Sequence, residues 1–172
     1  MRHADREIRD KEIIKAILDM CDVINIGMFD EEYPYVLPVN FGYEYEENLV
    51  FYMHHAVDGY KNRLVERNPK VCVVTHRFLD RVPNEYDGSN HDYRCVMAFG
   101  EMAFIGRESA DYARAWEVLC RHNGRTVPER IFNPGLRVLM SKIVCKPENV
   151  IGKAQRRITE LEEVPFKEHT RG

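Results

Sequence analysis

The segment M53-H-H-A-V-D-G-Y-K-N-R-L-V-E-R-N-P-K-V71 changes from one kind of local structure to another within a few residues. It predicts the end of an apolar strand, a glycine-containing turn, and a short helix that Asn68-Pro69 must end. A helix start offers unpaired backbone N–H groups and the positive end of the helix dipole, which both suit a phosphate. Lys61 would add a positive charge there, and Gly59 would let the backbone approach a ligand closely.

Two interpretations of this corner remain open on the residues alone. Asp58 could cap the same N–H groups with its own carboxylate, which would leave no room for an anion. Lys61 could equally be a solvated helix lysine. The patterns G-x-x-x-x-G-K-[ST] and G-x-G-x-x-G do not occur, so the corner is neither a Walker-type phosphate loop nor a dinucleotide-binding fingerprint.

Segments typical of β-strands surround this corner. Strands are expected at 23–29, 33–43, 48–55, 70–76, 93–106 and 137–145, and helices at 10–21, 59–65 and 109–123. Several turns are short enough for antiparallel hairpins, and Pro38 indicates that the second strand bends or has an exposed edge. The pattern predicts a mainly β fold, a six-stranded antiparallel barrel with helical additions.

Length and composition narrow the class of protein. The chain has 172 residues and a formal net charge of −3, which indicates one domain and gives no general electrostatic argument for nucleic acid. No apolar run reaches the roughly 18 residues of a membrane span, and the N-terminus shows no secretory signal. Five widely spaced cysteines without C-x-x-C are typical of reduced thiols. We expect a cytoplasmic protein without nucleic-acid or membrane partners, with a domain at 1–153 and a polar, partly ordered tail at 154–172.

An ordered set of motifs over residues 5–153 resembles the FMN-binding split barrel of the pyridoxamine 5′-phosphate oxidase superfamily. The motifs are H-x-A-x-x-G-x-K with L-x-x-N-P-x-V, I-G-M-F-D-x-x-x-P-Y-V-x-P-V-N-F-G-Y at 26–43, and Y-R-C-V-M-A-F-G at 93–100. Within that superfamily, the chain is most similar to the nitroimidazole-resistance (Nim) group of flavoproteins. The resemblance implies an FMN cofactor and a homodimer with the flavin at the subunit interface.

The resemblance also implies roles for individual residues. Lys61 falls on the residue that binds the FMN phosphate, and His54 on a histidine near the reactive edge of the flavin, where it would orient substrate or donate a proton. The implied cofactor-binding set is Pro38, Val39, Asn40, His54, Ala56, Gly59, Lys61, Arg94, Cys95 and Val96. Arg94 is followed by Cys95 where the oxidases have an Arg-Gln pair. This departure removes an amide hydrogen bond to the ring and argues against the oxidase reaction.

Several of these residues have a purely structural alternative. His54 could be a strand histidine that hydrogen-bonds to backbone, and Asn40 could only end its strand. Arg94 could pair with a carboxylate of the loop predicted at 81–92. Cys95 could be a buried apolar filler, because a reactive thiol needs a lowered pKa.

Metal and acyl-transfer chemistry are disfavoured by the residue pattern. A metal site could in principle be assembled from His54, His55, His76, His91 and Cys72, but adjacent strand residues point to opposite faces, so no metal is expected. No G-x-S-x-G nucleophile elbow occurs.

The leading hypothesis is therefore an FMN-dependent oxidoreductase that reduces nitroaromatic or similar small electron-poor compounds. One alternative is a non-catalytic flavin- or haem-binding module, with His54 or His76 as an axial haem ligand. Another is an interaction protein whose barrel edge only dimerises.

Overall fold

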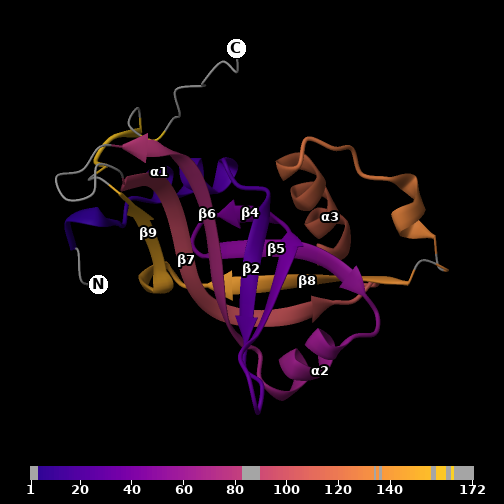
Figure 1. The fold of residues 1–172 in the computed structure, drawn as a ribbon. Coiled ribbons are helices and arrows are strands. Elements are labelled where there is room, and N and C mark those ends of the chain that lie inside the picture. The colour runs from indigo at the N-terminus through magenta and orange to yellow at the C-terminus, as the bar shows by residue number, and fades with distance from the viewer. Residues whose placement is uncertain are drawn as a thin grey trace. The chain divides into compact units, whose positions relative to one another are not determined.

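The computed structural model describes residues 4–82, 90–133, 135, 137–155, 158–161 and 164. Its helices are η1 (Ala4–Arg6), α1 (Lys11–Asp19), α2 (Tyr60–Arg67), α3 (Asp111–His122), η2 (Glu129–Phe132) and η3 (Pro147–Asn149). Its strands are β1 (Glu7–Ile8), β2 (Val23–Met28), β3 (Tyr35–Asn40), β4 (Gly42–Tyr45), β5 (Leu49–Ala56), β6 (Lys70–Val82), β7 (Asn90–Ile105), β8 (Val138–Cys145) and β9 (Val150–Ala154) (Figure 1).

Backbone contacts divide the chain into two compact units. Unit 1 comprises residues 1–21, 75–97 and 151–172, and unit 2 comprises residues 22–74 and 98–150. Each unit is built from segments that are far apart in the sequence. None of the described helices combines the length and the apolar character that crossing a membrane requires.

The expected mainly β class is confirmed, but the expected number of strands is wrong. The described residues form nine strands rather than six. The strand expected at 33–43 is divided at the fully buried Phe41, because β3 pairs with β2 whereas β4 pairs with β5. The other two additions are β1 and β9, which pair with each other. With two residues, β1 is too short to show a hydrophobic period.

Unit 2 contains most of the sheet. The strands that contribute to it follow the order β3-β2-β6-β7-β8-β5-β4, in which β3 is an edge strand, as Pro38 indicated. β5 and β8 are antiparallel over eight residue pairs, from Leu49↔Cys145 to Ala56↔Val138. This ladder sets which side chains of β5 point to each face of the sheet.

One face of this ladder is covered by α3, which contacts β4, β5 and β8. Its apolar side chains share a buried cluster with residues of β5 and β8, including Tyr52, Trp116, Leu119 and Met140. Gly42 of β4 allows the close approach, because a Cβ at this position would lie 2.5 Å from Leu119 Cα.

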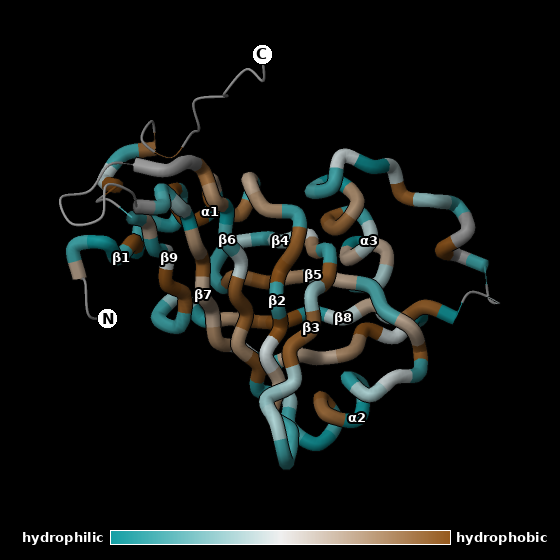
Figure 2. The backbone as a smooth tube through the Cα atoms, viewed as in Figure 1, coloured by the Kyte–Doolittle hydropathy of each residue, from teal (hydrophilic) through white to brown (hydrophobic). Residues whose placement is uncertain are grey.

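The other α-helix of unit 2, α2, forms hydrogen bonds with the β2–β3 hairpin. The tip of this hairpin is hydrophilic (Figure 2). The Tyr60 hydroxyl donates a hydrogen bond of 2.7 Å to Asp30, and Arg67 donates one of 2.6 Å to Glu31. These contacts fix the direction in which α2 leaves the end of β5.

Unit 1 contains α1 with β1 and β9. Asp10 caps α1, accepting hydrogen bonds of 2.9 Å from the backbone N–H groups of Glu12 and Ile13. The apolar side chains of α1 are buried, and Ile14 lies 3.2 Å from the Cβ that a side chain at Gly152 would have. In the tail expected at 154–172, the described residues Ile158 and Val164 are buried.

Gly42→Ala is expected to destabilise the protein by about 2 kcal/mol or more, because the new methyl group would collide with α3 backbone that cannot move independently. The matched control is Gly27→Ala in β2, where the nearest atom would lie at an ordinary 3.6 Å. Urea denaturation of both variants measures the effect. Equal losses of unfolding free energy would contradict the close approach of α3 to β4.

Candidate functional site

The corner between β5 and α2 carries no side-chain cap. Gly59 is the N-cap residue of α2, and no described side chain forms a cap hydrogen bond there. The carboxylate of Asp58 accepts a hydrogen bond of 2.7 Å from exposed Arg137 instead, so the alternative in which Asp58 caps the helix is wrong. A Cβ placed on Gly59 would meet nothing within 4 Å. Beside Gly59, at the start of α2, the described residues therefore leave open space.

Lys61 lies in this first turn, and its side chain is buried, with 7% of its surface exposed. The ammonium group donates a hydrogen bond of 2.8 Å to Asn62 Oδ1 and lies 5.4 Å from the centre of the Phe104 ring. Among the described residues, no carboxylate forms a salt bridge with it. Burial lowers the pKa of Lys61 to about 8. A buried cation without a counter-ion is costly, and an anion bound beside it would offset that cost.

His55 adds a neutral polar group next to Lys61. Its Nδ1 donates a hydrogen bond of 2.9 Å to the Ala56 carbonyl, and its Nε2 accepts one from the Ser141 hydroxyl. Burial, followed by the nearby charge of Lys61, lowers the pKa of His55 to about 4. His55 is therefore uncharged at neutral pH, and Lys61 supplies the positive charge of this corner.

Asn62 closes the corner from the other side. Its side-chain amide donates hydrogen bonds of 2.9 Å to the Val57 carbonyl and 3.3 Å to the Ala56 carbonyl. Three residues of the expected cofactor set, Ala56, Gly59 and Lys61, thus lie in one hydrogen-bonded corner.

His54 points to the opposite face of β5. Its ring stacks on Trp116 of α3, with ring centres 5.3 Å apart and planes 14° from parallel. Burial lowers the pKa of His54, and the charge of Arg125 lowers it further. Asn40 lines the same cavity, which has a volume of about 290 Å³. We call this space the His54 cavity; it is lined by Asn40, His54, Trp116, Leu119, Asn123 and Arg125, among others.

The residues of β3 alternate between two faces. Pro38 and Asn40 are exposed, whereas Val39 is partly buried and pairs with the buried Ile24. Asn40 also donates a hydrogen bond of 2.9 Å to the Asp22 carbonyl near the start of β2. Pro38 and Asn40 could line a ligand with their side chains, whereas the Val39 side chain points away from that face.

The remaining expected residues, Arg94, Cys95 and Val96, belong to the part of β7 in unit 1. Arg94 is buried and forms an ion pair with Asp92, as the structural alternative proposed. The loop expectation at 81–92 is wrong for Asp92, which belongs to β7. Burial raises the pKa of the Cys95 thiol, and Val96 is buried. The charge of Arg94 is thus neutralised within the chain.

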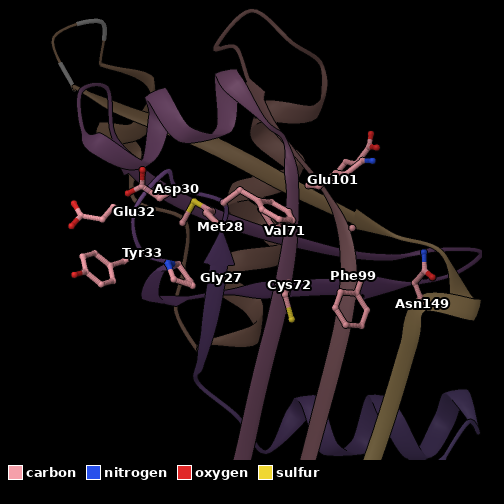
Figure 3. Close-up of a pocket in the computed structure, with 14 residues that line it drawn as sticks. Gly27, Met28, Asp30, Glu32, Tyr33, Val71, Cys72, Phe99, Glu101 and Asn149 are labelled. Atoms are coloured by element: carbon pink, nitrogen blue, oxygen red, sulfur yellow. The ribbon is translucent and has the colours of Figure 1, made fainter. Parts of the chain in front are cut away.

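In the part of the chain that the structure describes, no group of three or more His, Cys, Asp or Glu residues could hold a metal ion. A larger cavity of about 590 Å³ lies elsewhere in unit 2. Asp30 and Tyr33 of the β2–β3 hairpin line it, with Cys72 of β6 and Phe99 of β7 (Figure 3). None of the expected site residues lines this cavity.

The sequence did not single out His55, Phe104, Trp116 or Arg125 as functional. The strand period offered a signal for His55. Adjacent residues of a strand face opposite sides of the sheet, so His54 and His55 cannot share a site, and only one of them can lie on the side of Lys61. The residues of α3, β7 and β8 that contact His54, His55 and Lys61 are far from them in the sequence and belong to no motif.

The mainly antiparallel sheet and the basic residue at the start of the short helix after β5 agree with the split-barrel class that the motifs indicated. The chain belongs to the pyridoxamine 5′-phosphate oxidase family, whose model matches residues 10–144. This confirms the family that the motifs indicated. No curated protein matches the chain.

Solved structures share the fold at low sequence identity. A protein from Bacteroides thetaiotaomicron described as a candidate 5-nitroimidazole antibiotic resistance protein is 24% identical, with 86% of each chain covered and a TM-score of 0.67. The flavocytochrome Anf3 from Azotobacter vinelandii is 20% identical, with 95% of this chain and 76% of that chain covered and a TM-score of 0.66. An FAD- and haem-binding protein from Mycobacterium smegmatis is 16% identical, with coverages of 92% and 78% and a TM-score of 0.68.

Lys61→Met is expected to stabilise the flavin-free protein at pH 7 by about 2 kcal/mol, because it removes a buried and uncompensated charge. The folded-state pKa of Lys61 is lowered, so the unfolded chain holds more protons between about pH 8 and 10.5. The penalty is therefore complete below pH 8 and disappears toward pH 10.5, and the advantage of the variant should shrink over that range.

Denaturant unfolding at pH 7 and at higher pH measures this difference. Arg63→Met, which removes an exposed cation from the same helix, is the control and should give no such gain. A loss of stability in Lys61→Met that does not change with pH would contradict the uncompensated charge.

Proposed function

We propose that this chain is an FMN-dependent oxidoreductase that reduces small electron-poor compounds such as nitroaromatics, and that it acts in the cytoplasm as a homodimer with the flavin at the subunit interface. The observation that carries the proposal is the buried ammonium of Lys61, which has no carboxylate counter-ion among the described residues, at the uncapped start of α2.

The corner fits the phosphate of a flavin nucleotide. A phosphate would receive the positive end of the α2 dipole and the charge of Lys61 together. His55, being neutral, adds no competing charge, and the open space at Gly59 leaves room for phosphate oxygens. Ala56 contributes to the corner through its carbonyl, which accepts hydrogen bonds from His55 and Asn62.

The structural neighbours support a flavin as the ligand. One is described as a flavocytochrome, and another as binding FAD and haem. The corner itself requires only a terminal phosphate group. We propose FMN because a single phosphate satisfies a single lysine and one helix start.

In this proposal, the bound flavin supplies the electron-transfer chemistry, and the protein supplies position, shielding from water and hydrogen bonds. Pro38 and Asn40 would line the ring from β3, together with the backbone of Val39. His54, neutral at pH 7, would orient the substrate or exchange a proton through its imidazole.

The oxidase reaction that gives the family its name is not proposed for this chain. The charge of Arg94 is neutralised by Asp92, and Cys95 offers a protonated thiol where the oxidases have an amide. Reduction of nitroaromatic compounds is proposed instead, and the Bacteroides neighbour described as a candidate 5-nitroimidazole resistance protein supports it.

The second candidate is a non-catalytic module that binds flavin or haem. The neutral imidazole of His54 favours it, because a haem ligand must be unprotonated. The absorption spectrum of the purified protein separates the two: flavin bands support the first proposal, and a Soret band supports a haem module.

Lys61→Met is expected to weaken FMN binding by at least about tenfold, because it removes the charge that meets the phosphate. Arg63→Met, the exposed neighbour on α2, should bind FMN as the wild type does. Titration of the flavin-free proteins with FMN, followed by flavin fluorescence, measures both. Equal affinities in all three proteins would overturn the assignment of the phosphate site.

His54→Gln is expected to lower kcat/KM for reduction of a nitroaromatic compound by about 10²-fold, with FMN content unchanged. Steady-state kinetics and the flavin absorbance of the same sample measure the two quantities. Full activity at unchanged flavin content would remove His54 from the mechanism.

A further inference from the structure

Arg125 adds a positive charge to the wall of the His54 cavity. It follows Gly124, a residue with φ of 63° just after the end of α3, and it lines the cavity. His54 and Cys120 line the same cavity. Burial lowers the pKa of His54 and the charge of Arg125 lowers it further, whereas burial raises the pKa of Cys120 and the charge of Arg125 opposes that rise. Among the described residues, no carboxylate forms a salt bridge with Arg125.

Carbonyl groups at the end of α3 have hydrogen-bond donors other than the guanidinium of Arg125. The Leu119 carbonyl accepts a hydrogen bond of 2.8 Å from the Asn123 side chain, and the Cys120 carbonyl accepts one of 2.8 Å from the Arg125 backbone N–H. The Arg121 carbonyl accepts one from Gly124. Three of the last four carbonyls of the helix, those of Leu119, Cys120 and Arg121, therefore have donors other than the guanidinium.

The arginines within α3 differ from Arg125 in this respect. Arg114 forms a salt bridge of 3.0 Å with Glu44, and Arg121 lies 3.9 Å from the same carboxylate. Both of these arginines therefore pair with Glu44, an acidic residue of β4. Arg125, which is exposed, lines the His54 cavity instead.

The other walls of the cavity suit a flat ring. Trp116 and the stacked His54 form an aromatic surface, and Leu119 and Val138 add apolar contacts. Asn40 and Asn123 supply amide groups at the edge. A volume of about 290 Å³ is at the lower end of ligand sites, which restricts the occupant to a small molecule.

We infer that the His54 cavity binds a small planar aromatic carboxylate, whose ring lies against Trp116 and His54 and whose carboxylate pairs with Arg125. A guanidinium can hold a carboxylate through two parallel hydrogen bonds, which makes Arg125 the residue that selects for charge. The inference rests on the proposed function in treating this molecule as the substrate, whereas its binding requires no flavin.

Trp116 provides a direct readout, because it is the only tryptophan of the chain and lies in the wall of the cavity. The full-length protein is titrated with 4-nitrobenzoate and with 4-nitrobenzamide, in the flavin-loaded and the flavin-free form. Quenching of tryptophan fluorescence, corrected for probe absorption, gives the two dissociation constants. The probes share ring and nitro group and differ in charge.

Wild-type protein is expected to bind the benzoate about tenfold more tightly than the benzamide. Arg125→Gln should abolish this preference, and Arg121→Gln, the matched control one turn away, should retain it. Equal affinities for the two probes, absence of quenching by both, or a preference that survives in Arg125→Gln would overturn the inference.

The two proposals fail in different ways. A protein that takes up no flavin but prefers the benzoate contradicts the proposed function and leaves the carboxylate site standing. A protein that binds FMN through Lys61 but shows no charge preference contradicts the carboxylate site alone.

Discussion

The antiparallel ladder between β5 and β8 is the constraint on which both candidate sites depend. Because side chains alternate along a strand, the register places His54 against α3 and His55 toward Lys61 and Ser141. A slip by one residue would exchange the two histidines. Eight consecutive residue pairs, between strands with fully buried positions such as Leu49 and Met140, make such a slip costly.

Among the described residues, the two buried cations, Arg94 and Lys61, differ in how their charges are compensated, and the difference points to function. Arg94 is accompanied by Asp92, so its charge is compensated within the fold. Lys61 has an amide oxygen and an aromatic ring as neighbours, which stabilise an ammonium group only weakly. A fold that keeps a buried charge in this state loses stability and gains a site at which an anion is strongly favoured.

The extent of sequence-based prediction can be judged from particular elements. The helix after Asp10, the short helix before Asn68 and the strands around them have strong local signals, because their caps, prolines and apolar periods lie within a few residues. The family followed from motifs spread over much of the chain. The division at Phe41 and the β1–β9 pair were not predictable, because each depends on which distant strand a segment meets.

The candidate site shows the same division. The sequence by itself determined that a basic residue begins a helix after an apolar strand, and that His54 and His55 face opposite ways. Only the tertiary structure decided that Asp58 turns to Arg137, that Lys61 is buried without a counter-ion, and that Trp116 lies against His54. The reason is physical: strand period and helix start depend on neighbours in the chain, whereas burial and charge pairing depend on groups that folding brings from far along it.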